Sequence, residues 1–352
     1  MTALESLGGK LVGGIWDFGF ERTDDAGMQE AYRSGLVRDH NEREDVPEIK
    51  GDKVFLWEAM QKVYKRFLLN WQLIGSCVNG GGQNGLMARI ALEVLHGATH
   101  EVGEIPFTLI PYGQARSTGI GQPNRSEGDG ASGTVFARML NEVGTPPQST
   151  PGLPQPHIVP IKGREQDAAV LVYSPATVAE IERLGSNNRK VSEYELFFST
   201  NRNHKPEWLQ AAKKHKLQFI RCRSADEVKR ELRRGRPCLA AGDWGGRTQN
   251  LEYKGEPRVL WNTQRSSWNH QQSIWGFWQH PTLGEIYRWQ NQWYYLNNGI
   301  AIPIHGEVTN NEPPGGYWTP PSDVDYQART GEVFAIDNFE GYPGDINWLL
   351  GV

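Results

Sequence analysis

A glycine-rich stretch with one cysteine, residues 71–95, constrains this chain most. Its second half carries apolar residues at the spacing of a buried helix, with alanines between them: Leu86, Ala88, Ile90, Ala91, Val94 and Leu95. Cys77 follows Gly75-Ser76 and stands where this helix begins. A thiol at a helix N-terminus lies at the positive end of the helix dipole, which favours the thiolate. The stretch therefore predicts either a nucleophile or an ordinary buried cysteine.

Composition narrows the class of protein. The chain has 352 residues, of which 38% are hydrophobic and 22% charged, so it is long enough for one large domain or two lobes. Lys and Arg number 37 against 41 Asp and Glu, which leaves no basic excess for nucleic acid or an anionic membrane. The sequence has no apolar run near the roughly 18 residues of a membrane span and no signal peptide at its start. We expect a cytoplasmic protein without nucleic-acid or membrane partners.

The three cysteines are too few for a disulfide framework and are not spaced for a zinc site. The nine histidines include no HExxH motif. We therefore expect no cofactor and no metal. Cys222 and Cys238 each lie in a short apolar run and are expected in the core.

Local patterns divide the chain into three parts. Residues 1–50 are glycine-rich and then charged, which predicts an extension or arm. Residues 51–145 carry helical spacing over 54–69, 77–95 and 134–143, which predicts a helical lobe holding the nucleophile. Residues 146–352 begin with a proline-rich linker, 146–160, and continue as a mixed and finally β-rich lobe.

Within the third part, start and stop signals alternate with strand-like runs. Ser174-Pro175 predicts the start of a helix that ends at Gly185, and the capping box Ser224–Glu227 predicts another that ends at Gly235. A helix over 206–216 and a strand over 217–222 fall between these two helices. From Val259 onward, aromatic and β-branched residues alternate with polar ones, as in antiparallel sheets. The fold class predicted is α+β with two lobes, the first helical and the second β-rich.

A cysteine nucleophile needs a base, and the base needs a partner that fixes its tautomer. His270 is the best-placed base, because it stands at the predicted entry to a strand in the other lobe. Asn291 follows on a later strand and turn, between tryptophans, where it can accept the ring N–H of His270. By itself, His270 is also explained as an ordinary hydrogen-bonded strand histidine.

In this order the short motifs resemble those of the papain-like cysteine peptidases. They are Gly75-Ser76-Cys77 at a helix start, His270 on a strand that ends in Trp275-Gly276, and Asn291-Gln292-Trp293. The resemblance covers roughly residues 55–345. Gly128-Asp129-Gly130 and the segment 331–343 also look like poorly characterised bacterial and phage relatives of that fold.

The resemblance implies that Cys77 is the nucleophile, that His270 is the general base and later the acid, and that Asn291 orients His270. It also implies a glutamine whose amide joins the cysteine N–H in an oxyanion hole. Gln72 is the residue that matches, although it precedes Cys77 by five positions, one fewer than in the family. A peptide-binding cleft would be lined by Trp268, Trp289 and Trp293.

This chain departs from the family after the cysteine, where Val78-Asn79-Gly80-Gly81-Gly82 replaces the usual aromatic residue. Helix-interior glycines cost roughly 1 kcal/mol each relative to alanine. They are tolerated where another segment approaches the backbone closely, or where the site is free of catalytic demand. Gln271 also replaces the small residue that follows the histidine in the family.

These observations leave three hypotheses about function. The first is a thiol hydrolase acting on a peptide or protein substrate. The second is a catalytically silent papain-fold structural or binding protein, such as a component of a phage particle, with the arm 1–50 docking its neighbours and the virion as its location. The third directs the same residues at cell-wall peptides or amide-linked glycans.

Overall fold

The computed structural model describes residues 10–12, 15–17, 37–39, 48–95, 103–118, 130–186, 188–251, 259–304 and 312–339. Most of the predicted arm 1–50 lies outside these ranges. The described parts of it include the strands β1 (Lys10–Val12), β2 (Ile15–Asp17) and β3 (Val37–Asp39).

The chain has an α+β fold built on one large sheet. Its path runs β1-β2-β10-β9-β15-β8-β3, and β4, β11 and β14 attach to it at β10. The remaining strands of this sheet are β4 (Lys53–Phe55), β8 (Leu217–Arg221), β9 (Cys238–Leu251), β10 (Val259–His280), β11 (Gly284–Gln290), β14 (Gly316–Thr319) and β15 (Glu332–Phe339). The long pairs β9–β10 and β10–β11 are antiparallel, as the sequence predicts for the β-rich lobe.

Two smaller sheets complete the strand inventory of the described residues. β5 (Phe67–Asn70) runs parallel to β7 (Ala168–Val172), which pairs antiparallel with β6 (His157–Pro160). A hairpin joins β12 (Tyr294–Asn297) to β13 (Ile300–Pro303).

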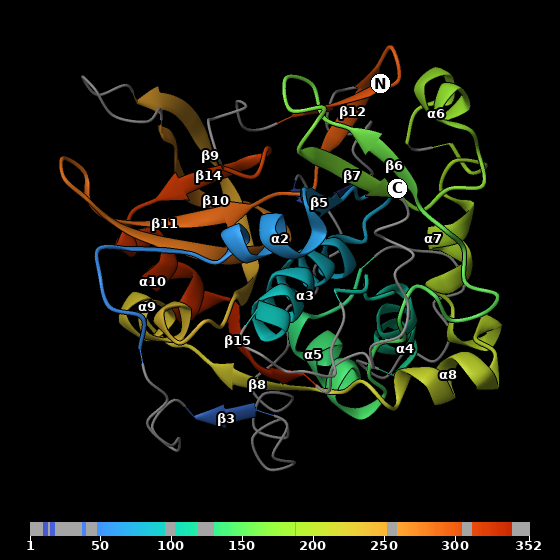
Figure 1. The fold of residues 1–352 in the computed structure, drawn as a ribbon, viewed down its shortest axis with the longest axis horizontal. Coiled ribbons are helices and arrows are strands. Elements are labelled where there is room, and N and C mark those ends of the chain that lie inside the picture. Colours follow the sequence, from blue (N-terminus) through green and yellow to red (C-terminus); the bar gives the residue numbers. More distant parts are fainter. Residues whose placement is uncertain are drawn as a thin grey trace.

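The helices lie on both sides of a central one, α3 (Cys77–Leu95). In Figure 1, β9, β10, β11 and β14 lie on one side of α3, and α4, α5, α7 and α8 on the other, which gives the two-lobed layout. The other described helices are α2 (Trp57–Tyr64), α4 (Leu109–Thr118), α5 (Gly133–Glu142), α6 (Val178–Leu184), α7 (Glu193–Phe198), α8 (Pro206–Ala212), α9 (Ala225–Arg233) and α10 (Pro321–Thr330), with a 3-10 turn at Asn201–Asn203. None of these helices is both long and apolar enough to cross a membrane.

The glycines of α3 let neighbouring segments lie directly against its backbone. A Cβ added at Gly81 would lie 3.0 Å from the Gln271 carbonyl oxygen and 3.1 Å from the Gln272 Cα, both on β10. A Cβ at Gly82 would lie 2.4 Å from the Phe136 ring. Close approach of other segments therefore explains the glycine run after Cys77.

Two predicted helices differ from the structure. The pattern over 54–69 divides into β4, α2 and β5, because Lys65 adopts a left-handed backbone (φ 61°) that ends α2. The helix expected at Ser174 begins instead after Thr177, whose hydroxyl and the Glu180 carboxylate form a complete capping box. By contrast, Ser224 caps α9 as predicted, accepting from the Glu227 N–H.

Tryptophans of the C-terminal part fill the core between the large sheet and α2. Trp57 stacks on Phe55 with ring centroids 4.5 Å apart, and the Trp318 ring meets Phe55 edge-on at 6.0 Å. Trp278 packs against Trp318 at 6.0 Å. Such aromatic pairs bury large apolar areas, so this crowding of tryptophan serves packing.

Candidate functional site

Cys77 is the first residue of α3 and is 0% exposed. The Gly80 N–H donates to the Ser76 carbonyl at 3.0 Å, which begins the helical hydrogen bonding at this point. The first turn of α3 carries no acidic residue. The thiol thus stands at the positive end of a helix, the environment that favours a thiolate.

His270 lies in the middle of β10, opposite Gly242 of β9, and is 2% exposed. The prediction that it stands at the entry to a strand is wrong, because β10 continues on both sides of it. The next residue, Gln271, donates its side-chain N–H to the Val78 carbonyl at 3.2 Å. The strand that carries His270 is therefore bonded directly to the first turn of α3.

Asn291 follows β11 immediately and fixes the imidazole of His270. Its Oδ1 lies 3.0 Å from His270 Nε2 and also accepts the Gln292 backbone N–H at 2.8 Å. Because an amide oxygen only accepts hydrogen bonds, Nε2 must carry the ring proton. In the neutral ring, Nδ1 then holds the lone pair, and the second donor fixes the orientation of the Asn291 amide.

Trp293 covers this pair. Its ring lies against the His270 ring, with centroids 4.4 Å apart and planes at 32°, and it is 1% exposed. Its indole N–H donates to the Gln72 Oε1 at 3.1 Å. Trp293 thus shields the imidazole from water and also holds Gln72.

The side-chain amide of Gln292 links three segments of the site. Its Nε2 donates to the backbone oxygens of Gln271 (2.8 Å) and Cys77 (3.2 Å) and to the Gln72 Oε1 (3.3 Å). The structure thus brings Gln72 and Cys77 together with His270's neighbour Gln271. The sequence does not mark Gln292 as a site residue, and its only local signal is its place inside the motif Asn291-Gln292-Trp293.

Of the three tryptophans expected to line a substrate cleft, Trp289 and Trp293 are buried, and the side chain of Trp268 is not described. Trp289 is 2% exposed, donates to the Thr319 Oγ1 at 2.8 Å and stacks on Tyr317, so it and Trp293 both lie inside the protein. The side chain of Trp268 lies outside the described residues. The backbone of Trp268 pairs with Trp16 of β2, which runs parallel to β10 at the two residues before His270.

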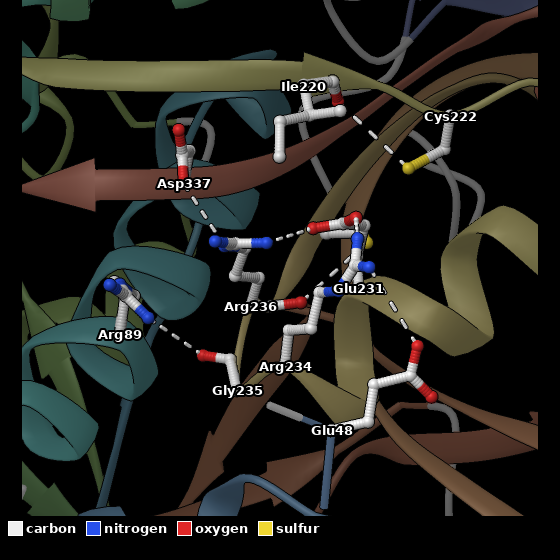
Figure 2. A network of polar contacts seen from close by, with 10 residues as sticks. Glu48, Arg89, Ile220, Cys222, Glu231, Arg234, Gly235, Arg236 and Asp337 are labelled. Atoms are coloured by element: carbon white, nitrogen blue, oxygen red, sulfur yellow. Dashed lines mark hydrogen bonds and ion pairs between the residues drawn. The ribbon is translucent and has the colours of Figure 1, made fainter. Parts of the chain in front are cut away.

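Cys222 and Cys238 are core residues, as predicted. Both are 0% exposed, and Cys222 lies beside a buried ionic network (Figure 2). In that network, the Glu231 carboxylate binds Arg236 at 2.8 Å and Arg234 at 2.9 Å. Burial, together with the neighbouring Cys222 thiol and Glu231 charge, raises the pKa of the Cys238 thiol well above its usual value.

Within the described part of the chain, no group of three His, Cys, Asp or Glu side chains is arranged to hold a metal ion. The groups gathered here are an imidazole held by an amide oxygen, and two glutamine amides that donate to the carbonyl oxygens of Cys77 and Val78.

Comparison with known proteins gives similarity to solved structures only. No family model and no curated protein sequence matches the chain. Xylellain, a cysteine protease from Xylella fastidiosa, is 16% identical, with 86% of this chain and 95% of that chain covered and a TM-score of 0.45. Procathepsin B from Trypanosoma congolense is 10% identical, with coverage of 93% and 83% and a TM-score of 0.39. The proform of the ragweed pollen cysteine protease Amb a 11 is 10% identical, with coverage of 93% and 77% and a TM-score of 0.39.

Proposed function

We propose that this protein is a papain-like cysteine peptidase or amide hydrolase acting through Cys77, His270 and Asn291. The observation that carries the proposal is the 3.0 Å contact between His270 Nε2 and Asn291 Oδ1. This contact leaves Nδ1 as the basic nitrogen, which is the state that a general base requires.

Each residue has a defined role in the proposed reaction. His270 takes the Cys77 proton, the sulfur attacks the substrate carbonyl, and the imidazolium then protonates the leaving amine. Water releases the acyl group with His270 again acting as base. The Gln72 oxygen is held by Trp293 and Gln292, so its NH2 end is the donor for the oxyanion, together with the Cys77 N–H.

The proposed substrate is a peptide or protein, because an acyl-transfer site of this kind acts on amide carbonyls. The roles assigned above use side chains and backbone alone, with no step through a cofactor. Association with partners through the arm 1–50 stays a proposal, since most of that arm lies outside the described residues.

The alternative is a catalytically silent protein that keeps this fold for binding or assembly, including a part of a phage particle. One observation favours it: the Cys77 side chain is 0% exposed, whereas a nucleophile must reach its substrate. The two proposals differ in whether the thiol turns over an amide.

A fluorogenic peptide library tests the proposal, with the wild-type chain compared with Cys77→Ser and Cys238→Ser. We expect turnover by wild type and Cys238→Ser and none by Cys77→Ser. Equal rates in wild type and Cys77→Ser, or no turnover with peptides retained on the protein, would favour the silent binding module.

A further inference from the structure

The connection between Gln72 and Cys77 is held by a buried carboxylate from a distant helix. Only four residues, Leu73 to Ser76, separate the two site residues, and all four are buried. Glu195 lies in α7 and is 0% exposed. Its Oε1 accepts the Leu73 backbone N–H at 3.1 Å, and its Oε2 accepts the Ser76 hydroxyl at 2.6 Å.

These two hydrogen bonds hold the segment Leu73 to Ser76 at both of its ends. Leu73 directly follows Gln72, and Ser76 directly precedes Cys77. Moving either donor would therefore move a residue of the proposed oxyanion hole. Burying a carboxyl group costs free energy unless it is hydrogen-bonded. The bonds to Leu73 and Ser76 therefore stabilise α7 in its position, and α7 in turn holds the segment 73–76.

Both oxygens of the Glu195 carboxyl group are used in this contact. Oε1 accepts from the Leu73 backbone N–H, which can only donate, and Oε2 accepts from the Ser76 hydroxyl. The bond from the Ser76 hydroxyl, at 2.6 Å, is at the short end of the range for O–H···O hydrogen bonds.

We propose that Glu195 is a positioning residue of the site, which sets the separation of the Gln72 amide from the Cys77 sulfur by holding both ends of the segment between them. This inference rests on the proposed function for its catalytic consequence. Gln72 and Cys77 are one residue closer in sequence than in the resembled family, and the bonds to Glu195 of α7 fix the segment between them in one position.

The test compares Glu195→Gln and Ser76→Ala with Glu231→Gln as the matched control. Glu231 is equally buried and binds two arginines in the network drawn in Figure 2, which includes neither Gln72 nor Cys77. The first readout is amide hydrogen exchange in the peptide that contains Leu73. We expect faster exchange there in both site variants and unchanged exchange in Glu231→Gln.

The second readout separates the oxyanion hole from the thiol. A peptide aldehyde forms a tetrahedral adduct that uses oxyanion donors, whereas iodoacetamide alkylates the sulfur without them. Misplacement by about 1 Å costs up to roughly a hundredfold in rate or affinity, so we expect aldehyde affinity to fall roughly tenfold or more in Glu195→Gln, with a smaller change in alkylation. Rescue of both readouts is expected from Glu195→Asp only in part, because its shorter side chain reaches one donor.

The outcomes distinguish this inference from the proposed function. Unchanged exchange at Leu73 in Glu195→Gln overturns the positioning role, whatever the thiol does. Equal loss of aldehyde affinity in Glu195→Gln and Glu231→Gln also overturns it, because it would mark general destabilisation. If exchange at Leu73 is faster in Glu195→Gln but wild type binds no aldehyde, Glu195 holds the segment and the peptidase proposal is rejected.

Discussion

Asn291 determines which nitrogen of His270 carries the proton. Its oxygen receives two donors, the imidazole Nε2 and the Gln292 N–H. These bonds keep the ring in one tautomer and one orientation beneath the Trp293 ring. A residue that removes the proton of a thiol needs both conditions, because a rotated ring or the other tautomer has no lone pair directed at that proton.

Replacing Asn291 with alanine tests this role. Asn291→Ala removes the acceptor of the Nε2 proton, so we expect peptide turnover to fall roughly ten- to hundredfold through loss of orientation. Asn79→Ala is the control, because Asn79 is equally buried and accepts from Thr108. Steady-state kinetics on both variants decide the matter, and an equal effect from the two would reject an orienting role.

The Cys238 thiol should make the free energy of unfolding depend on pH. Its pKa is raised in the fold by burial and by Cys222 and Glu231, so the folded state favours the protonated thiol. The stabilisation is complete below about pH 9, the ordinary thiol value, and is lost as pH rises toward the folded pKa. We expect the free energy of unfolding to fall above pH 9 by up to about 1.4 kcal/mol per pH unit.

Urea unfolding between pH 8 and 10 measures this loss. Cys238→Ala should flatten the decline, whatever its effect on stability at pH 8. Parallel curves for the two proteins would show that the Cys238 proton has no part in it.

At the scale of elements, α3 packs directly against β10, so the helix that begins at Cys77 lies against the strand that carries His270. Gln271 and Gln292 donate to the Val78 and Cys77 carbonyls, and Gly81 allows the β10 backbone to lie against the helix. The distance between the two elements is therefore set by the absence of a side chain at Gly81.

Gly81→Ala should push β10 away from α3, because the new Cβ would meet the strand backbone at 3.0 Å. We expect peptide turnover to fall roughly tenfold or more, since small displacements are costly to catalysis. Gly85→Ala is the matched control on the same helix: its Cβ would meet the flexible end of Leu239 at 2.7 Å. Turnover retained in Gly81→Ala would show that this packing does not set the site geometry.

Elements with strong local signals were predictable from sequence, and the others were not. Residues 77–95 read as a helix because their apolar spacing fits no other structure, and Ser224 read as a cap because its partner lies three residues away. Residues 54–69 predict a single helix because the short strands on either side of α2 continue its apolar pattern. Lys65 in a left-handed conformation has no signal in a single sequence.

Across the whole molecule, the site depends on segments far apart in the chain. Short motifs are enough to predict Gln72, Cys77, His270 and Asn291 as site residues. They do not predict Glu195 and Gln292, whose contacts with Leu73, Ser76 and the Cys77 carbonyl are tertiary. No local pattern marks such residues.

The N-terminal hairpin β1–β2 lies beside the strand that carries His270. β2 pairs with Trp268 and Asn269, the two residues before His270, while Cys77 and His270 are 0% and 2% exposed. Removing residues 1–17 should therefore open the site and speed iodoacetamide labelling of Cys77 at least roughly tenfold. Removal of residues 1–9 is the control, since it keeps both strands. Equal labelling of the two deletion variants would show that the hairpin does not restrict access.

The proposed activation of Cys77 by His270 is measured by the pH dependence of Cys77 alkylation by iodoacetamide. Labelling is followed by mass spectrometry in wild type and His270→Ala. We expect wild type to be labelled at pH values well below the ordinary pKa of a free thiol, and His270→Ala to be labelled more slowly at the same pH. Labelling that follows an ordinary thiol titration in both proteins would contradict it.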